Sequence, residues 1–230
     1  MANLGGYENE GVMDNELLDI LRERRSSYSF LSRIYREEVS LALLKELTNL
    51  APQEESDGGQ QIQARFFAGL QRADPQKAQT DLAAEYAALF LNMGRKPVYP
   101  YESVYTSEER LLMQKARDDV VKEYAAEGLD RIAAFNEPED HIAIELEFMA
   151  HLCQQTLGAL EQGDRKTGAA YLQKQKTFLE KHLLVWAPQF CDDVLQAAQS
   201  DFYKGIAQLT KDLLASEPET IDELLKELAE

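Results

Sequence analysis

Residues 137–152 read EPEDHIAIELEFMAHL, and this stretch has the clearest helical pattern in the chain. On a helix with about 100° per residue, its apolar side chains cover a broad arc, as in a helix that is buried on most sides. His141 and Glu145 fall near the middle of that arc, one turn apart. Glu147, His151 and Gln154 fall on the polar face. The pattern predicts a core helix that directs two polar groups inward.

A buried Glu145 needs a partner, because an unpaired ionised carboxylate is costly in a protein interior. We predict a structural ion pair with Arg25, which falls beside Leu21 and Tyr28 on the first helix. The alternative is a polar patch in an apolar groove that meets a cationic or polar group of a ligand. Asp140 has two interpretations as well. It is either a helix-start acid stabilised by the helix dipole, or an anion that receives a guanidinium.

Composition favours helices along the rest of the chain, since Gly and Pro are scarce, at 12 and 7 of 230 residues. Strong helix formers dominate, and no alternating run of β-branched residues predicts a strand. Asp74-Pro75 is a helix start and Asn136 is a plausible N-cap. The sequence predicts an all-α bundle of about nine to ten helices. The expected segments are 14–39, 41–50, 60–72, 75–93, 106–127, 137–160, 164–185, 188–200, 201–215 and 216–230.

The sequence divides the chain into three regions. Residues 1–13 are expected to form a mobile tail, residues 14–215 a helical domain, and residues 216–230 a short acidic amphipathic helix. The proline-rich loop RKPVYPYESVY, residues 95–105, cannot be a regular helix. It leaves two arrangements open: one bundle, or two lobes joined near residues 92–105.

The net charge is −17, from 41 acidic and 24 basic residues. Nucleic acid and anionic lipid are disfavoured as partners, whereas a basic partner would be attracted. The simpler explanation is that the acidity maintains solubility. The start of the chain has no basic and apolar secretory signal, and no run of 18 apolar residues predicts a membrane span. We therefore expect a cytoplasmic protein with no stable membrane insertion, whose Cys153 and Cys191 are free thiols.

Motifs for catalysis are missing from the sequence. The three histidines do not have the spacing of a zinc or di-iron site, and neither a phosphate-binding loop nor a nucleophile elbow occurs. We expect no enzyme, no metal and no cofactor. The alternative is a hydrolase that uses Asp140, His141 and Glu145. The tyrosines of the PYESVY loop suit protein recognition, although the same rings are equally suited to filling a core.

Three blocks resemble the signature blocks of the TorD/DmsD/NarJ family of redox-enzyme maturation chaperones: EYAALF (85–90), PYESVY (100–105) and EPEDHIAIELEFM (137–149). They occur in the family's order, and the resemblance covers about residues 15–215. The third block is the most specific, because its Pro-x-Asp-His and Glu-x-x-Phe-Met elements are not generic. Arg95 and Lys96 depart from the aromatic-rich segment of some members, which affects fine ligand specificity.

The resemblance implies an all-helical cytoplasmic chaperone without a cofactor of its own. It would bind the twin-arginine leader of a molybdoenzyme catalytic subunit until the molybdopterin is inserted, before export. A close alternative is an assembly chaperone for a non-exported, nitrate-reductase-like subunit. Monomers and exchanged dimers are both compatible with the sequence, which does not identify the client. By matching motif positions, the leader-binding residues would be Tyr86, Leu89, Phe90, Pro100, Tyr101, Glu102, Ser103, Pro138, Asp140 and His141.

Overall fold

The computed structural model describes residues 7–50, 74–129 and 135–229, and it confirms an all-α fold. Helix accounts for 78% of the structure, and the described residues form no strand. The expected helix at 60–72 lies outside the described residues. The helices are α1 (Tyr7–Arg36), α2 (Leu41–Leu50), α4 (Pro75–Phe90), α5 (Glu102–Thr106), α6 (Lys115–Ala126), α7 (Ile142–Glu161), α8 (Arg165–Phe178), the π-helix η1 (Leu179–Leu183), α9 (Leu184–Ala197) and α10 (Asp201–Ala229).

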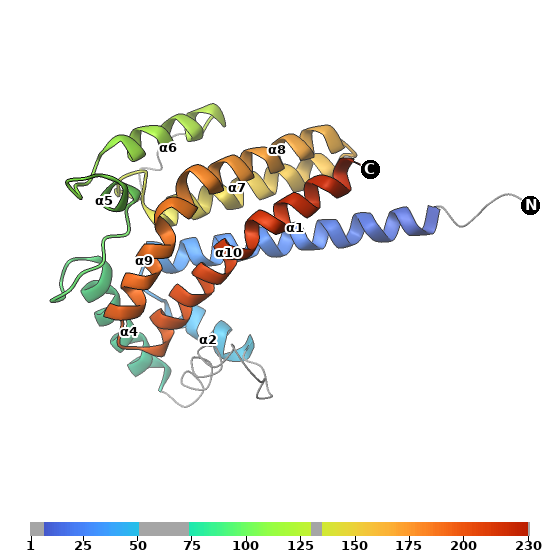
Figure 1. Ribbon diagram of the computed structural model, residues 1–230. Coiled ribbons are helices and arrows are strands. Elements are labelled where there is room, and N and C mark those ends of the chain that lie inside the picture. Colours follow the sequence, from blue (N-terminus) through green and yellow to red (C-terminus); the bar gives the residue numbers. More distant parts are fainter. Residues whose placement is uncertain (1–6, 51–73, 130–134, 230) are drawn as a thin grey trace, which may run out of the picture.

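Four long helices form the body of the molecule. In Figure 1, α1, α7, α8 and α10 run in roughly the same direction, with α2 and α4 at one end. Helix α1 packs along α7, and α7 packs in turn on α8. The short α5 lies against α9, and α6 follows it across the bundle. The bundle therefore places α1, α6 and α7 around the region described below as a candidate site.

Helices α8 and α9 are joined through η1 into one continuous helix, from Arg165 to Ala197. The sequence predicts a break before Pro188, but Pro188 lies inside α9. The fully buried Trp186 and Phe190 lie on either side of it. When this helix is counted once, the described residues contain 8 helices, slightly fewer than the nine to ten expected.

The first and the last described helices are both longer than expected. Helix α1 begins at Tyr7 rather than near Asp14. Helix α10 continues through Pro218 to Ala229, so the expected separate helix at 216–230 is its last part. Ile221 and Leu224 are both buried there, which explains why this segment continues the core instead of leaving it.

Local capping by a side chain explains the start of α4, whereas α5 and α6 begin without such a cap. The Asp74 side chain accepts hydrogen bonds from the backbone N–H groups of Gln76 and Lys77, as the Asp-Pro start of α4 predicts. The expected cap at Asn136 is wrong, because the N-cap of α7 is His141. The expected helix at 106–127 is shorter than predicted, because Thr106 is the last residue of α5 and α6 begins only at Lys115.

A single cluster of buried side chains runs through the bundle and includes Tyr35, Phe90, Val120, Leu146 and Phe190. It therefore contains residues from both sides of segment 92–105, which favours one bundle over two lobes. Among the described helices, none combines the length and the apolar character needed to cross a bilayer.

Candidate functional site

Segments 100–103 and 138–142 meet in what we call the α5–α7 junction. Tyr101 and His141 form an isolated antiparallel bridge. The backbone N–H of Glu102 donates to the Asp140 carbonyl at 3.0 Å, and that of Ile142 donates to the Pro100 carbonyl at 2.9 Å. The structure thus brings together the second and third predicted blocks, far apart in sequence, at the start of α7.

Asp140 is fully buried in this junction, and its Oδ2 accepts a hydrogen bond from the Ser103 backbone N–H at 2.8 Å. Burial raises the pKa of this carboxyl, and the bonds at Ser103 partly oppose the shift. The acid therefore holds the start of α5 in place. It is not an exposed anion for a guanidinium in this conformation.

His141 is also buried, between the rings of Tyr101 and Phe135, with centroids 5.1 and 5.3 Å away. Its Nδ1 accepts a hydrogen bond from the Ala143 backbone N–H at 3.0 Å. Burial, and secondarily the charge of Arg36, lower its pKa to about 3. A neutral imidazole therefore caps α7, which explains why His rather than Asn136 begins this helix.

Glu102 and Glu145 approach each other in the interior beside the junction. The Glu102 Oε2 lies 2.9 Å from His182 Nδ1, on η1. Trp186 donates its indole N–H to Glu145 Oε2 at 3.0 Å. Burial first, and then the charge of Glu102, raise the pKa of Glu145 well above its ordinary value. Burial and the neighbouring acid thus favour the protonated form of Glu145, and its hydrogen-bond partner is an indole rather than a cation.

The predicted Arg25–Glu145 ion pair is therefore wrong. The Arg25 guanidinium donates to the Gln154 side-chain oxygen at the surface. Its neighbour Arg24 is the buried arginine, and it forms a two-point pair with Glu217 at 2.9 and 2.6 Å. Position 24 lies three residues after Leu21 and four before Tyr28, on the buried face of α1, whereas position 25 lies beside that face.

The first predicted block lies apart from the junction. Tyr86, Leu89 and Phe90 are buried on α4. The Phe90 ring packs edge-on against Tyr35 and Tyr203 at 5.9 Å from each. These side chains form an aromatic core cluster and do not present a recognition surface. Of the ten predicted leader-binding residues, nine are buried and only Pro138 is partly exposed. Their direct contact with a leader therefore stays a prediction.

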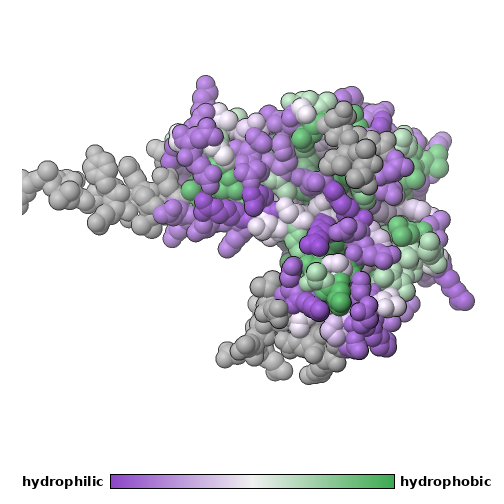
Figure 2. Space-filling model, turned by 180° about the vertical axis from the view of Figure 1, so that it is seen from behind, coloured by the Kyte–Doolittle hydropathy of each residue, from purple (hydrophilic) through white to green (hydrophobic). Residues whose placement is uncertain are grey.

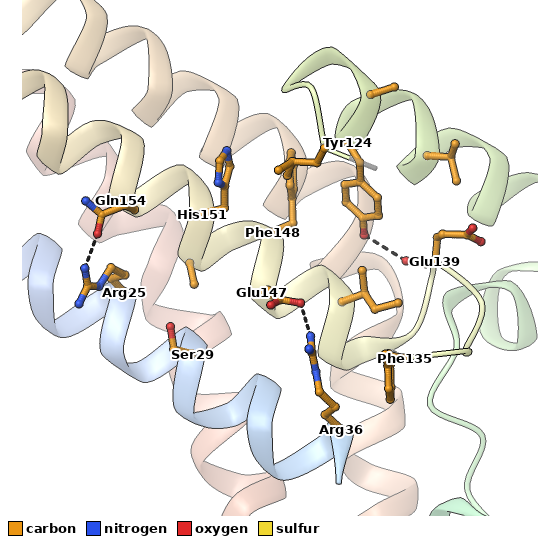
Figure 3. Close-up of a pocket in the computed structure, with 15 residues that line it drawn as sticks. Arg25, Ser29, Arg36, Tyr124, Phe135, Glu139, Glu147, Phe148, His151 and Gln154 are labelled. Carbon is orange, nitrogen blue, oxygen red and sulfur yellow. Dashed lines mark hydrogen bonds and ion pairs between the residues drawn. The ribbon is translucent and has the colours of Figure 1, made fainter. Parts of the chain in front are cut away.

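An open groove lies on the other side of the junction, between α1, α6 and α7 (Figure 3). Its volume is about 590 Å³. Rings and aliphatic side chains supply its apolar wall, and charged and polar groups line the rest. The lining residues are Arg25, Ser29, Arg36, Val121, Tyr124, Ala125, Leu129, Phe135, Glu139, Ile144, Glu147, Phe148, Ala150, His151 and Gln154.

The two carboxylates that line the groove are already paired. Arg36 forms an ion pair with Glu147 and lies over the Phe135 ring, 5.0 Å from its centroid. Arg117 donates two hydrogen bonds to Glu139, at 2.6 and 3.0 Å. The Glu147 side chain is 45% exposed, so it remains accessible from solvent. The groove therefore offers an apolar surface with exchangeable carboxylates at its edge, which suits a peptide that carries cations and apolar side chains.

The groove and the junction share a wall. The Tyr124 hydroxyl donates to the Glu139 carbonyl at 3.1 Å, next to Asp140, and Phe135 packs on His141. Burial, followed by the charges of Glu145, Asp140 and Glu102, raises the pKa of Tyr124. The junction residues thus lie directly behind the groove and position its aromatic wall.

None of the ten predicted leader residues lines the groove, and its lining was missed as a site. One signal was available, because Glu147, His151 and Gln154 share the polar face of the helix that contains segment 137–152. No function was predicted for that face. No group of three or more His, Cys, Asp or Glu side chains in the described ranges is placed to hold a metal ion.

Comparison with known proteins identifies relatives along most of the chain. A family model for the nitrate reductase delta subunit matches residues 43–192. A TorD chaperone from Vibrio cholerae is 32% identical over 220 residues, which cover 91% of this chain and 97% of the relative. A TorD chaperone from Aliivibrio fischeri is 30% identical and covers 85% and 93%. A crystal structure described as a redox enzyme maturation protein from Archaeoglobus fulgidus has a TM-score of 0.50 at 20% identity, covering 84% and 93%, which shows a shared fold.

Proposed function

This chain belongs to the nitrate reductase delta subunit and TorD family of redox-enzyme maturation chaperones, and from this premise we propose that it binds the twin-arginine leader of a molybdoenzyme catalytic subunit. It would hold that subunit in the cytoplasm until the molybdopterin is inserted, before export. The members of this family are chaperones and not catalysts, so the hydrolase alternative is set aside.

The groove between α1, α6 and α7 is the observation that carries this proposal. A twin-arginine leader combines paired arginines with a moderately apolar stretch. The Phe148, Tyr124 and Phe135 rings would contact the apolar stretch. An arginine of the leader would exchange with Arg36 at Glu147, because a guanidinium and a carboxylate can pair through two parallel hydrogen bonds.

The charge of the whole molecule supports the same partner. A net charge of −17 attracts a cationic peptide from about a Debye length away, some 8–10 Å at physiological salt. The groove itself contains both signs of charge, so the attraction would direct the peptide toward the molecule and the apolar wall would retain it.

In this proposal the junction acts indirectly. Asp140 and His141 hold the start of α7 and the Phe135 ring, and they thereby shape the groove without touching the peptide. This role is compatible with their burial. It places the predicted residues of the third block beside the leader rather than against it.

A second candidate follows from the family model, whose description names the nitrate reductase delta subunit. In that case the client would be a subunit that is not exported. Its N-terminus would lack the twin arginines but would still place an apolar segment in the groove.

Isothermal titration calorimetry with synthetic leaders separates these candidates. The panel contains leaders of trimethylamine N-oxide, dimethyl sulfoxide, formate and selenate enzymes and the N-terminus of a nitrate reductase catalytic subunit. Each twin-arginine leader is paired with a version that carries two glutamines. We expect one leader to bind and its glutamine version to bind more weakly. Failure of every twin-arginine leader to bind would refute the proposal, and binding of the nitrate reductase N-terminus alone would establish the second candidate.

The same titration tests the junction with Asp140→Asn and His141→Ala. We expect weaker leader binding in both, because each change loosens the wall behind the groove. Unchanged affinity in both variants would remove these residues from the account of binding.

A further inference from the structure

Two loops flank α5, loop 91–99 before it and loop 107–114 after it, and they concentrate the exposed apolar side chains of the molecule. Most of the large apolar residues that are exposed in the described part of the chain lie there: Leu91, Met93, Tyr99, Leu111, Leu112 and Met113. Met93 is 76% exposed and Met113 is 56% exposed. Each loop thus carries its own group of exposed apolar side chains, and exposed apolar patches mark interaction sites on soluble proteins.

Figure 2 shows where these loops lie on the surface. The edge that carries α5 and its flanking loops is at the left of Figure 1 and at the right of Figure 2. There, green hydrophobic patches interrupt a mostly purple hydrophilic surface. No residue of either loop lines the groove between α1, α6 and α7. The loops therefore form a second surface, separate from the proposed leader site.

The backbone of both loops is held in unusual conformations. The positive φ angles of non-glycine residues in the described part of the chain all occur here, at Asn92 (59°), Arg110 (52°) and Met113 (60°). Such conformations are uncommon for side chains other than Asn and persist only where surrounding contacts impose them. Strained backbone of this kind occurs most often at functional sites.

Specific contacts fix each loop. In the first, a Cβ at Gly94 would lie 2.4 Å from the Ala88 carbonyl oxygen, so only glycine permits this loop to fold back on the end of α4. The Met93 backbone N–H donates to the Ala87 carbonyl at 3.1 Å. In the second, the Gln114 backbone N–H donates to the Ser103 hydroxyl at 3.1 Å. The apolar side chains are therefore presented by ordered turns.

The charge of loop 91–99 narrows the kind of partner. This loop contains Arg95 and Lys96 and no acidic residue, although the whole chain has a net charge of −17. The described residues supply no ion-pair partner for either of them. Loop 107–114 contains Arg110 with Glu108 and Glu109. The surface is thus apolar with one basic end on an acidic molecule.

We propose that loops 91–99 and 107–114 form a docking surface for an acidic, apolar face on the folded body of the client subunit, separate from the groove that takes its leader. This inference rests on the proposed function for the identity of the client. An anionic membrane would attract these loops but repel the rest of the molecule.

Two loop variants, each compared with a control variant elsewhere on the surface, test this docking surface. The apolar variant combines Leu111→Ser with Met113→Ser, and its control is Ile20→Ser, at an exposed apolar residue of α1. The charge variant combines Arg95→Glu with Lys96→Glu, and its control is Lys166→Glu, at an exposed lysine of α8. The probes are the leader peptide found by the calorimetric panel and the purified cofactor-free catalytic subunit of the same enzyme without its leader.

We expect both loop variants to bind the leader peptide like the wild type and the leaderless subunit about tenfold more weakly, a factor that corresponds to about 1.4 kcal/mol. Affinity of the wild type for the leaderless subunit should fall with added salt, and the charge variant should lose that dependence. Both controls should match the wild type.

The inference is overturned if the leaderless subunit does not bind, or if loop variants and controls bind it equally. It is also overturned if the loop variants change only self-association, measured by sedimentation, or only binding to vesicles of anionic phospholipid. Absence of leader binding alongside loop-dependent binding of the leaderless subunit would instead contradict the leader proposal and leave the docking surface supported.

Discussion

At the scale of single residues, Glu145 combines full burial with an incomplete set of hydrogen-bond partners. Its Oε2 accepts from Trp186, whereas its Oε1 has no partner among the described residues. The charged and titratable groups that face it are Glu102 from α5, Asp140 from the junction and Tyr124 from α6. A proton on Glu145 removes the repulsion from the two other acids and allows Oε1 to donate toward Glu102.

This protonation predicts a pH-dependent stability. A carboxyl whose pKa is raised by folding stabilises the fold fully below about pH 4.5, the ordinary glutamate value, and this contribution is lost as pH rises toward the folded pKa. Glu145→Gln keeps an acceptor for Trp186 but cannot ionise. The variant should therefore gain free energy of unfolding relative to the wild type as pH rises, by up to about 1.4 kcal/mol per pH unit. Urea unfolding at several pH values measures the difference, and a difference independent of pH would contradict a neutral Glu145.

Arg24 and Glu217 form a buried ion pair that the Tyr28 hydroxyl completes by donating to Glu217 at 2.7 Å. Removal of one partner leaves an uncompensated buried charge, so Glu217→Gln should lower the free energy of unfolding by about 3–5 kcal/mol. The exposed pair of Lys77 and Asp81 is the control, and Asp81→Asn should cost less than about 1 kcal/mol. Equal effects in the two variants, measured by chemical denaturation, would show that burial does not determine the cost.

At the scale of elements, α10 is one helix whose last part belongs to the core. Ile221 and Leu224 are 0% and 2% exposed, and Arg165 donates to the Glu227 carbonyl at 2.6 Å. The sequence predicts most helices correctly because their apolar periodicity is strong. It could not predict that α10 passes through Pro218, because the packing that stabilises this part of the helix comes from residues distant in sequence.

Truncation after Ser216 tests this assignment. Loss of Ile221 and Leu224 from the core should cost about 1.5–3 kcal/mol for each, in addition to the loss of Glu217 beside Arg24. Thermal unfolding should show a clear decrease in Tm. Truncation after Glu223 provides a comparison that retains Ile221 and Glu217, and it should be milder. An unchanged Tm after the longer truncation would support the independent tail helix that the sequence suggested.

The start of α7 shows which features of the site could be predicted from the sequence. The inward direction of His141 and Glu145 follows from the helical arc and is confirmed by their burial. The hydrogen bond from Trp186 to Glu145 was not predictable, because Trp186 reaches Glu145 only when α9 is packed into the bundle. The same reason explains the error at Arg25, since a one-residue shift on α1 decides which of two adjacent arginines is buried.

At the scale of the whole molecule, the bundle separates two surfaces around α5 and α6. The groove lies between α1, α6 and α7, and the apolar loops lie on either side of α5. The junction connects them, because Ser103 receives the Gln114 N–H and donates its own N–H to Asp140. Sequence blocks identified the family and the junction, whereas the groove exists only after three helices distant in sequence are packed together.

We propose that the groove between α1, α6 and α7 holds the client leader. This is tested by calorimetry, which measures the affinity of the cognate leader peptide for a variant that combines Leu129→Ser with Ile144→Ser. Both side chains line the groove and neither is fully buried, so the fold should persist. We predict leader binding at least about tenfold weaker than the wild type, with Ile20→Ser on the exposed face of α1 unchanged. Wild-type affinity in the groove variant would contradict the claim.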